Sequence, residues 1–233
     1  MKSKADYVII GAGISGASIA YHLAKEGAKN IVVVEKEYLT SGATGRCGAG
    51  IRQQWGTKMN CLLAKKSVDF FETAHEELGY DGDIEYKQEG YLVIASNEEE
   101  DLEFTENVKL QNSLGIPSRK LTKEEAATIV PYLNKEVVYS ATFCPTDGHL
   151  NPFTTTEAFY KAAERMGVEF NFYTEVKDIV IVDGQIEKVV TDKGDIFTQN
   201  VINAAGGWSK QIGEMVNVDI PVYSKNHEIF HGK

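Results

Sequence analysis

The spacing of apolar residues near the start of the chain predicts a strand, a helix and a second strand in close succession. Residues 7–10 form a short run rich in β-forming side chains. Over residues 14–26, apolar side chains recur at helical spacing. Residues 31–34 are continuously apolar, which is typical of a parallel strand buried on both faces. The pattern therefore predicts a β-α-β unit that ends at Glu35.

The same reasoning predicts the later elements. Helices are expected over residues 60–78, 101–114, 122–130, 153–166 and 210–216, with the acidic run 98–101 as a solvated helix start. Strands are expected on both sides of 88–90 within 84–96, and over 137–143, 200–204 and 220–233. Residues 169–176, 177–182 and 187–191 read as a β-meander, and 145–152 as a turn.

Composition and charge narrow the class of protein. The chain has 42% hydrophobic and 25% charged residues, as ordinary globular domains do. No apolar run approaches the ~20 residues that cross a bilayer, and residues 1–6 lack the apolar core of a signal peptide. We therefore expect a cytoplasmic protein without a membrane span.

The formal net charge of −10 disfavours nucleic acid as a partner. The three cysteines form no CxxC pair, so no metal site is expected.

The sequence between the first strand and helix, GAGISG, carries the clearest chemistry. Gly11 permits a tight turn, Gly13 lets the backbone approach a pyrophosphate, and Gly16 lets the helix pack closely on the strand. The helix N-terminus offers free N–H groups to phosphates. Glu35 follows Gly16 by 19 residues, where a carboxylate accepts hydrogen bonds from ribose hydroxyls. We interpret this as a dinucleotide site, with a purely structural glycine turn as the alternative.

Residues 38–55, YLTSGATGRCGAGIRQQW, are too rich in glycine to form a stable helix or strand. A flexible surface loop is one interpretation. Because the segment directly follows the acidic residue, we favour a loop that wraps a flat cofactor ring.

Three segments together resemble the flavin-dependent D-amino-acid oxidase superfamily: GAGISG with VVVEK, TDGHLNP ahead of a helix, and NAAGGWS. The loop SGATGRCGAGIRQQW is similar to the β subunits of hetero-oligomeric sarcosine oxidase and dye-linked L-proline dehydrogenase. The resemblance implies an α/β fold with an α+β insert, in which a Rossmann-like FAD-binding domain with a β-meander joins part of an antiparallel-sheet substrate domain. Residues 1–84 and 145–219 would form the first domain, and 85–144 and 220–233 the second.

The resemblance also implies non-covalent FAD and a longer chain, so we expect this sequence to be truncated at its C-terminus. The residues implied in FAD binding are Gly11, Gly13, Ile14, Ser15, Gly16, Glu35, Lys36, Ser41, Gly42, Thr44, Gly45, Arg46, Cys47, Gly48, Val176, Ala204, Ala205, Gly206 and Trp208. Ordinary packing is the alternative for Val176 and Trp208, and covalent attachment of flavin at Cys47 is disfavoured.

Arg52 lies where family members bind the substrate carboxylate, and a guanidinium suits a carboxylate because it donates two parallel hydrogen bonds. A surface arginine paired with a glutamate is the alternative. The expected activity is hydride transfer to flavin from the carbon beside the nitrogen of a small amine or amino acid, such as sarcosine, proline or glycine.

The resemblance also bears on a second flavin and on partners. In the sarcosine oxidase β subunits a His of the turn matching TDGHLNP holds FMN at a subunit interface, but here Leu150 takes that place and His149 lies one residue away. Interface FMN and a hetero-oligomer with an α-type subunit therefore stay open. Two other functions stay open as well: an NAD-linked dehydrogenase, and a non-catalytic FAD-binding fragment.

Overall fold

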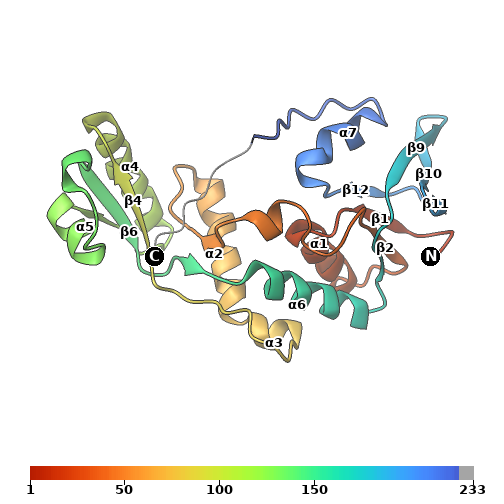
Figure 1. Cartoon of the computed structure of the whole chain (residues 1–233), viewed down its shortest axis with the longest axis horizontal. Helices are drawn as coiled ribbons and strands as arrows, with labels where there is room; N and C mark the ends of the chain where they lie inside the picture. Colours follow the sequence, from red (N-terminus) through yellow and green to blue (C-terminus); the bar gives the residue numbers. More distant parts are fainter. Residues whose placement is uncertain (226–233) are drawn as a thin grey trace. The chain divides into compact units, whose positions relative to one another are not determined.

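The computed structural model describes residues 1–225 and divides into two compact units (Figure 1). The first unit contains Met1–Gly48, Leu78–Ile84 and the chain from Pro152 onward, and the second contains Ala49–Glu77 and Glu85–Asn151. The predicted fold class, a parallel α/β sheet accompanied by antiparallel sheets, is confirmed.

A four-stranded parallel sheet forms the centre of the first unit, in the order β12-β1-β2-β8. Its strands are β1 (Tyr7–Ile10), β2 (Ile31–Val34), β8 (Glu169–Asn171) and β12 (Val201–Asn203). Helices α1 (Ile14–Lys25) and α6 (Pro152–Arg165) pack against each other, with the rings of Tyr21 and Phe159 5.7 Å apart.

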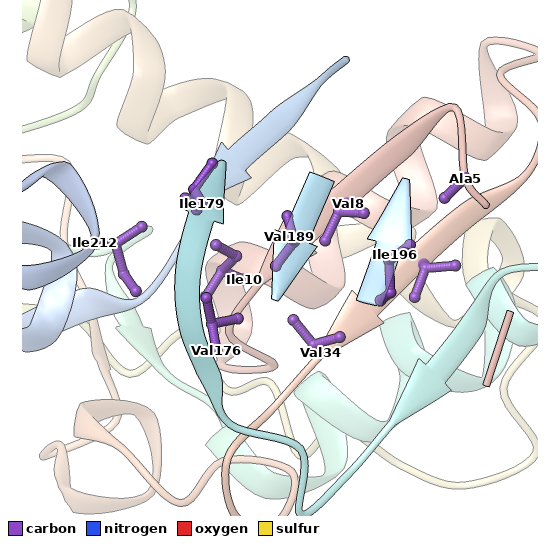
Figure 2. Close-up of a cluster of buried hydrophobic side chains, with 10 residues drawn as sticks. Ala5, Val8, Ile10, Val34, Val176, Ile179, Val189, Ile196 and Ile212 are labelled. Atoms are coloured by element: carbon purple, nitrogen blue, oxygen red, sulfur yellow. The ribbon is translucent and has the colours of Figure 1, made fainter. Parts of the chain in front are cut away.

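The meander of β9 (Val176–Val182), β10 (Gln185–Thr191) and β11 (Gly194–Phe197) packs on this parallel sheet. Alternate residues of a strand point to the same face, and Val8, Ile10, Val32 and Val34 therefore form one buried layer. Figure 2 shows this layer against Ile179, Val189 and Ile196 of the meander strands. Ile9 and Val33 are also fully buried, which is why the strands are apolar at every position.

The second unit holds a three-stranded antiparallel sheet in the order β4-β6-β5 and the two-stranded sheet β3-β7. Its strands are β3 (Gly50–Ile51), β4 (Tyr91–Ala95), β5 (Arg119–Leu121), β6 (Ser140–Cys144) and β7 (Gly148–His149). The remaining helices of the described chain are α2 (Lys58–Glu72), α3 (Ala74–Leu78), α4 (Glu98–Ser113), α5 (Lys123–Ile129) and α7 (Ser209–Glu214), with short 3-10 turns at Ala43–Arg46, Lys135–Val137 and Gly206–Trp208.

Non-glycine residues with unusual backbone angles explain two wrong predictions. Glu85 has a φ of 55°, so residues 84–87 form only an isolated bridge, and β4 is the one strand within 84–96. Tyr173 has a φ of 53° and ends β8 early. Consequently β8 joins the parallel sheet, and the third meander strand is β11, which the sequence pattern did not predict.

Other predicted elements are wrong in their extent. The predicted helix over 60–78 breaks at Thr73, whose hydroxyl donates a hydrogen bond to the Phe70 carbonyl. Strand β6 begins at Ser140 because residues 135–137 form a 3-10 turn that the Asn134 side chain caps. The 38–55 loop contains a 3-10 turn and β3, and the predicted 145–152 turn contains β7. Residues 220–225 form no strand, and the rest of the predicted 220–233 strand lies outside the described residues.

The start of α4 supplies a test of the predicted acidic helix start. Asn97 caps α4 by accepting the Glu100 N–H at 3.0 Å, and acidic side chains follow in the first turn. We expect Asn97→Ala to lower the free energy of unfolding by about 1 kcal/mol in urea titration. Asn112→Ala near the other end of α4 is the matched control, because that exposed side chain caps nothing and should change stability little. Equal stability of the two variants would contradict the cap.

Candidate functional site

The carboxyl ends of β1 and β12 meet at the point where the order of the parallel sheet changes direction, which is where ligands bind in open α/β sheets. Gly11 follows β1 with a φ of +105°, and a Cβ there would lie 2.5 Å from the Ala204 carbonyl oxygen. A Cβ on Gly16 would lie 1.9 Å from the Gly11 carbonyl oxygen. Both positions therefore require glycine, in the roles that the sequence predicts.

The first turn of α1 has backbone N–H donors without a partner inside the helix. Its N-cap residue is Gly13, which has no side chain to accept their hydrogen bonds, and Thr44 Oγ1 accepts one of them, the Ile14 N–H, at 3.1 Å. The Ser15 side chain is exposed beside them. Since the N-terminus of a helix carries a partial positive charge, this turn is suited to an anionic group.

The Glu35 carboxylate organises the surrounding backbone. Only 9% of Glu35 is exposed, and its Oε2 accepts the Ala12 N–H at 2.9 Å. Its Oε1 accepts the Glu37 N–H at 2.9 Å and the Ser41 hydroxyl at 3.3 Å. A carboxylate has about four lone-pair positions, so Oε2 keeps capacity for a ligand hydroxyl.

A second turn, residues 203–208, lies beside the glycine turn. The Ala204 N–H donates to the Ile10 carbonyl at 2.9 Å. The Asn203 side chain accepts the Ala205 N–H at 3.2 Å and donates to the Ser209 carbonyl at 2.8 Å. Sequence reasoning missed Asn203, although its place directly before a glycine turn is a recognisable signal for such a role.

Lys36, next to Glu35, and Trp208, in the second turn, contact each other. The Lys36 Nζ lies 3.6 Å from the centre of the Trp208 ring, a cation–π contact. Trp208 remains 42% exposed, and a Cβ on Gly42 would lie 3.9 Å from its ring. The Trp208 ring is thus held, partly exposed, beside Gly42.

The 41–48 segment of the loop folds on itself within the first unit. Arg46 donates to the Ser41 carbonyl, and a Cβ on Gly45 would lie 2.5 Å from the Thr40 carbonyl oxygen. Cys47 is exposed, with its Sγ 3.1 Å from the Thr44 carbonyl oxygen, and Gly48 is exposed as well. By contrast, the Val176 side chain packs in the core of this unit, so only its backbone is left for a ligand.

Arg52 belongs to the second unit and lines a cavity of about 530 Å³ there. The cavity is lined by Gly50, Ile51, Arg52, Trp55, Ala64, Ser67, Phe71 and Tyr91. The Arg52 guanidinium lies 4.5 Å from the centre of the Trp55 ring, and the Trp55 indole N–H donates to the Arg52 carbonyl at 3.0 Å. No carboxylate of residues 1–225 forms an ion pair with Arg52, so this guanidinium is available to an anion.

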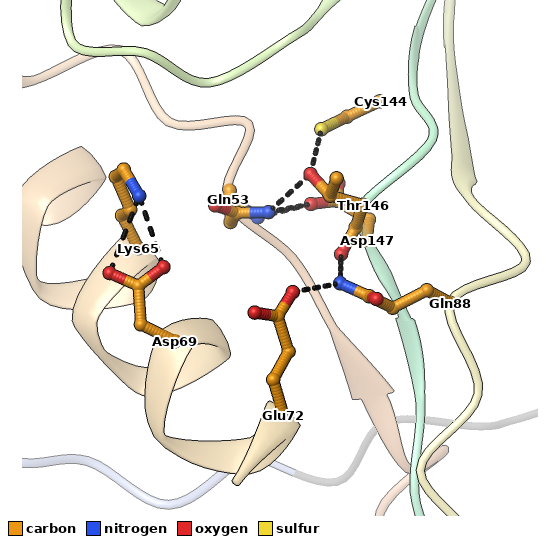
Figure 3. A network of polar contacts seen from close by, with 8 residues as sticks. All are labelled: Gln53, Lys65, Asp69, Glu72, Gln88, Cys144, Thr146 and Asp147. Atoms are coloured by element: carbon orange, nitrogen blue, oxygen red, sulfur yellow. Dashed lines mark hydrogen bonds and ion pairs between the residues drawn. The ribbon is translucent and has the colours of Figure 1, made fainter.

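A buried carboxylate that sequence reasoning missed, Asp147, bonds the residue that follows Arg52. Asp147 is fully buried and accepts the Gln53 N–H at 2.8 Å, and Gln53 also donates to the Thr146 hydroxyl at 2.8 Å (Figure 3). Burial raises the pKa of Asp147, while the hydrogen bonds from Gln54 and Gln53 oppose that rise. The next residue but one, His149, has its Nδ1 3.9 Å from a Glu89 carboxylate oxygen, whereas Leu150 is buried.

Within residues 1–225, no group of three or more His, Cys, Asp and Glu side chains is arranged to hold a metal ion. None of the helices in the described part of the chain is both long and apolar enough to cross a membrane.

The comparisons with known proteins agree on one family. The family described as FAD dependent oxidoreductase (DAO) matches residues 6–232. The chain is 29% identical over 228 residues to mitochondrial dimethylglycine dehydrogenase of Rattus norvegicus, covering 97% of this chain and 26% of that protein. It is 32% identical over 234 residues to mitochondrial sarcosine dehydrogenase of Mus musculus, covering 97% and 25%. The mitochondrial regulatory subunit of pyruvate dehydrogenase phosphatase of Mus musculus is 29% identical over 231 residues, covering 97% and 26%.

Solved structures agree with these relatives. L-Proline dehydrogenase from P. horikoshii superposes with a TM-score of 0.85 at 40% identity, covering 94% of this chain and 57% of that one. Glycine oxidase from Bacillus cereus superposes with a TM-score of 0.73 at 31% identity, covering 91% and 58%. The chain thus spans about a quarter of the length of these curated relatives and somewhat more than half of these solved chains.

The two oxygens of Glu35 supply a test of how the glycine turn is held. In Glu35→Gln one carboxylate oxygen becomes an NH₂ group that faces a backbone N–H. The hydrogen bond from either the Ala12 or the Glu37 amide is therefore lost. We expect the free energy of unfolding to fall by about 1–3 kcal/mol, and hydrogen exchange at the Ala12 or Glu37 amide to accelerate. Glu37→Gln is the control, since the exposed Glu37 side chain takes no part in these bonds. Unchanged exchange at both amides would contradict the assigned role.

Proposed function

Since the chain belongs to the DAO family of FAD-dependent oxidoreductases, we propose that its first unit binds FAD non-covalently and that the complete protein oxidises the C–N bond of a small amino acid. The family acts on amines and amino acids through FAD. This dependence on FAD argues against an NAD-linked dehydrogenase.

The fit of FAD rests on the turn at the end of β1. The N–H groups of the first turn of α1, which has no side-chain cap at Gly13, suit a pyrophosphate, and the spare capacity of Glu35 Oε2 suits a ribose hydroxyl. Lys36, Trp208 and the 41–48 segment are proposed to form further contacts. When bound, FAD supplies a hydride acceptor, while the protein binds and orients the donor.

The substrate class rests on Arg52. Its guanidinium has no ion-pair partner among the described residues and lines a cavity that three aromatic side chains, Trp55, Phe71 and Tyr91, also line. Dimethylglycine, sarcosine, L-proline and glycine, which appear in the names of the relatives, all combine a carboxylate with an amine. We propose that Arg52 binds that carboxylate and that the aromatic walls receive the rest of the molecule.

A non-catalytic FAD-binding module is the second candidate. It is favoured by one relative that is named as a regulatory subunit. Interface FMN beside His149 and an α-type partner subunit stay predictions.

FAD binding has a direct test in Gly13→Asp. Gly13 has a φ of −73°, which any residue adopts, but an added Cβ would lie 3.0 Å from Thr44 Oγ1, so the Thr44 side chain must shift slightly. Aspartate at an N-cap stabilises a helix, which offsets this shift, while its charge repels a pyrophosphate. We expect a yellow parent protein with the absorption bands of oxidised flavin. In the variant we expect FAD affinity to fall by about a hundredfold, without loss of thermal stability. Asn217→Asp, at an exposed residue of the same unit, is the charge control. Equal FAD affinity in parent and Gly13→Asp would contradict the proposed site.

The role of Arg52 is tested with two substrates that differ only in the carboxylate. With an artificial electron acceptor, we expect Arg52→Gln to lower kcat/KM for proline by about a hundredfold and to change that for pyrrolidine little. A similar loss for both amines would show that Arg52 does not bind the carboxylate. A protein that holds FAD but oxidises no amine would favour the non-catalytic module.

A further inference from the structure

The cavity of the second unit has two walls that one buried side chain connects. Arg52, Trp55 and Tyr91 all line it; we call the segment of Arg52 and Trp55 the first wall, and Tyr91, the first residue of β4, the second wall. We propose that Asp147 is a positioning residue that fixes both walls through the amide groups of Gln53 and Gln54. The inference deepens the proposed role of Arg52 and rests on it only where ligand binding is concerned.

The first wall is held through Gln53, the residue that directly follows Arg52. Asp147 Oδ1 accepts the Gln53 backbone N–H at 2.8 Å and its side-chain amide at 3.3 Å. Gln53 is only 2% exposed, so no water competes for these donors. The backbone of Gln53 therefore sets where the Arg52 side chain leaves the chain.

The second wall is held through Gln54. Its amide nitrogen donates to Asp147 Oδ2 at 3.0 Å and to the Tyr91 carbonyl at 2.8 Å. Its amide oxygen is buried and has no partner among the described residues, so the amide is oriented by its donors alone. One side chain thus links the carboxylate to β4.

The charge of Asp147 serves these amides rather than an ion pair. Among the residues that the structure describes, no Lys or Arg forms an ion pair with Asp147. The carboxylate therefore leaves the positive charge of Arg52 uncompensated, as an anion-binding cavity requires. Hydrogen bonds to a buried charged acceptor are stronger than those between neutral groups, which suits a rigid connection.

The test uses Asp147→Asn. The introduced side chain keeps one oxygen for the Gln53 N–H but presents an NH₂ group to Gln54. The Gln54 amide can avoid two facing donors only by turning its unpartnered oxygen inward, and it then loses the Tyr91 carbonyl. The substitution therefore keeps the bond from the Gln53 N–H but detaches the Gln54 side chain, and with it the segment of Arg52 and Trp55, from β4.

Trp55 reports the result without any cofactor or substrate. The chain has two tryptophans, so Trp208→Phe leaves Trp55 as the single fluorophore. In that background we expect Asp147→Asn to increase acrylamide quenching of Trp55 about twofold and to lower its anisotropy, as a loosened segment does. Unchanged quenching and anisotropy would overturn the positioning role.

Propionate tests the link to Arg52, with propionamide as its neutral counterpart, both followed by Trp55 fluorescence. We expect Asp147→Asn to bind propionate about tenfold more weakly than the parent. A parent that does not prefer propionate would refute the proposed function of Arg52, whereas the quenching result would still decide the positioning role. Parent-like propionate affinity in a loosened variant would overturn the claim that positioning serves binding.

Two further variants separate positioning from general stability. Gln88→Ala removes an amide that donates to Glu72 and to the Thr146 carbonyl in the same neighbourhood (Figure 3). Among the described residues, this amide forms no hydrogen bond with Gln53 or Gln54. We expect parent-like Trp55 signals from this control. If Asp147→Asn does not fold, Gln54→Met provides the test, because it removes the hydrogen bond to the Tyr91 carbonyl. We expect this variant to loosen Trp55. Parent-like quenching of Trp55 in Gln54→Met would overturn the proposal.

Discussion

The close approach of α1 to the end of β1 is the constraint on which the first unit depends. With glycine at position 16, the first helical turn lies against the Gly11 carbonyl, where any Cβ would collide at 1.9 Å. The same approach brings residues 203–208 beside the glycine turn, since Gly11 also has no room for a side chain next to Ala204. Only this backbone accommodates the parallel sheet, the helix and the second turn together. It leaves the N–H groups of the first turn of α1 without a capping side chain.

The electrostatics around the proposed FAD site are unusual for an acidic protein that binds an anion. The chain carries a formal net charge of −10, and Glu35 lies at the site itself. The charge of Glu35 is directed at the Ala12 and Glu37 amides and is therefore locally balanced. The nearby cations are already engaged, Lys36 over the Trp208 ring and Arg46 at the Ser41 carbonyl. The remaining attraction for an anion comes from backbone dipoles, which need no net positive charge.

The sequence pattern correctly predicted elements whose formation depends on neighbouring residues alone. Strands β1 and β2 were predicted with their observed bounds because each is apolar at every position. The extent of β8 could not be predicted, since it depends on a left-handed Tyr173 that no composition rule marks. The Gln53–Asp147 bond joins residues 94 positions apart, and only the folded chain brings such partners together. The glycines of the candidate site were thus readable from sequence, whereas Asn203 and Asp147, which hold its backbone, were not.

Each of the two units contains a buried carboxylate that accepts hydrogen bonds from amide groups. Glu35 holds the start of the 38–55 loop through the Ser41 hydroxyl, and Asp147 holds its end through Gln53, each within its own unit. The chain passes from the first unit to the second at Gly48 and Ala49, between these two anchors. The segments that carry candidate ligand-binding groups are therefore fixed on either side of Gly48, one in each unit, by a buried carboxylate from outside the loop.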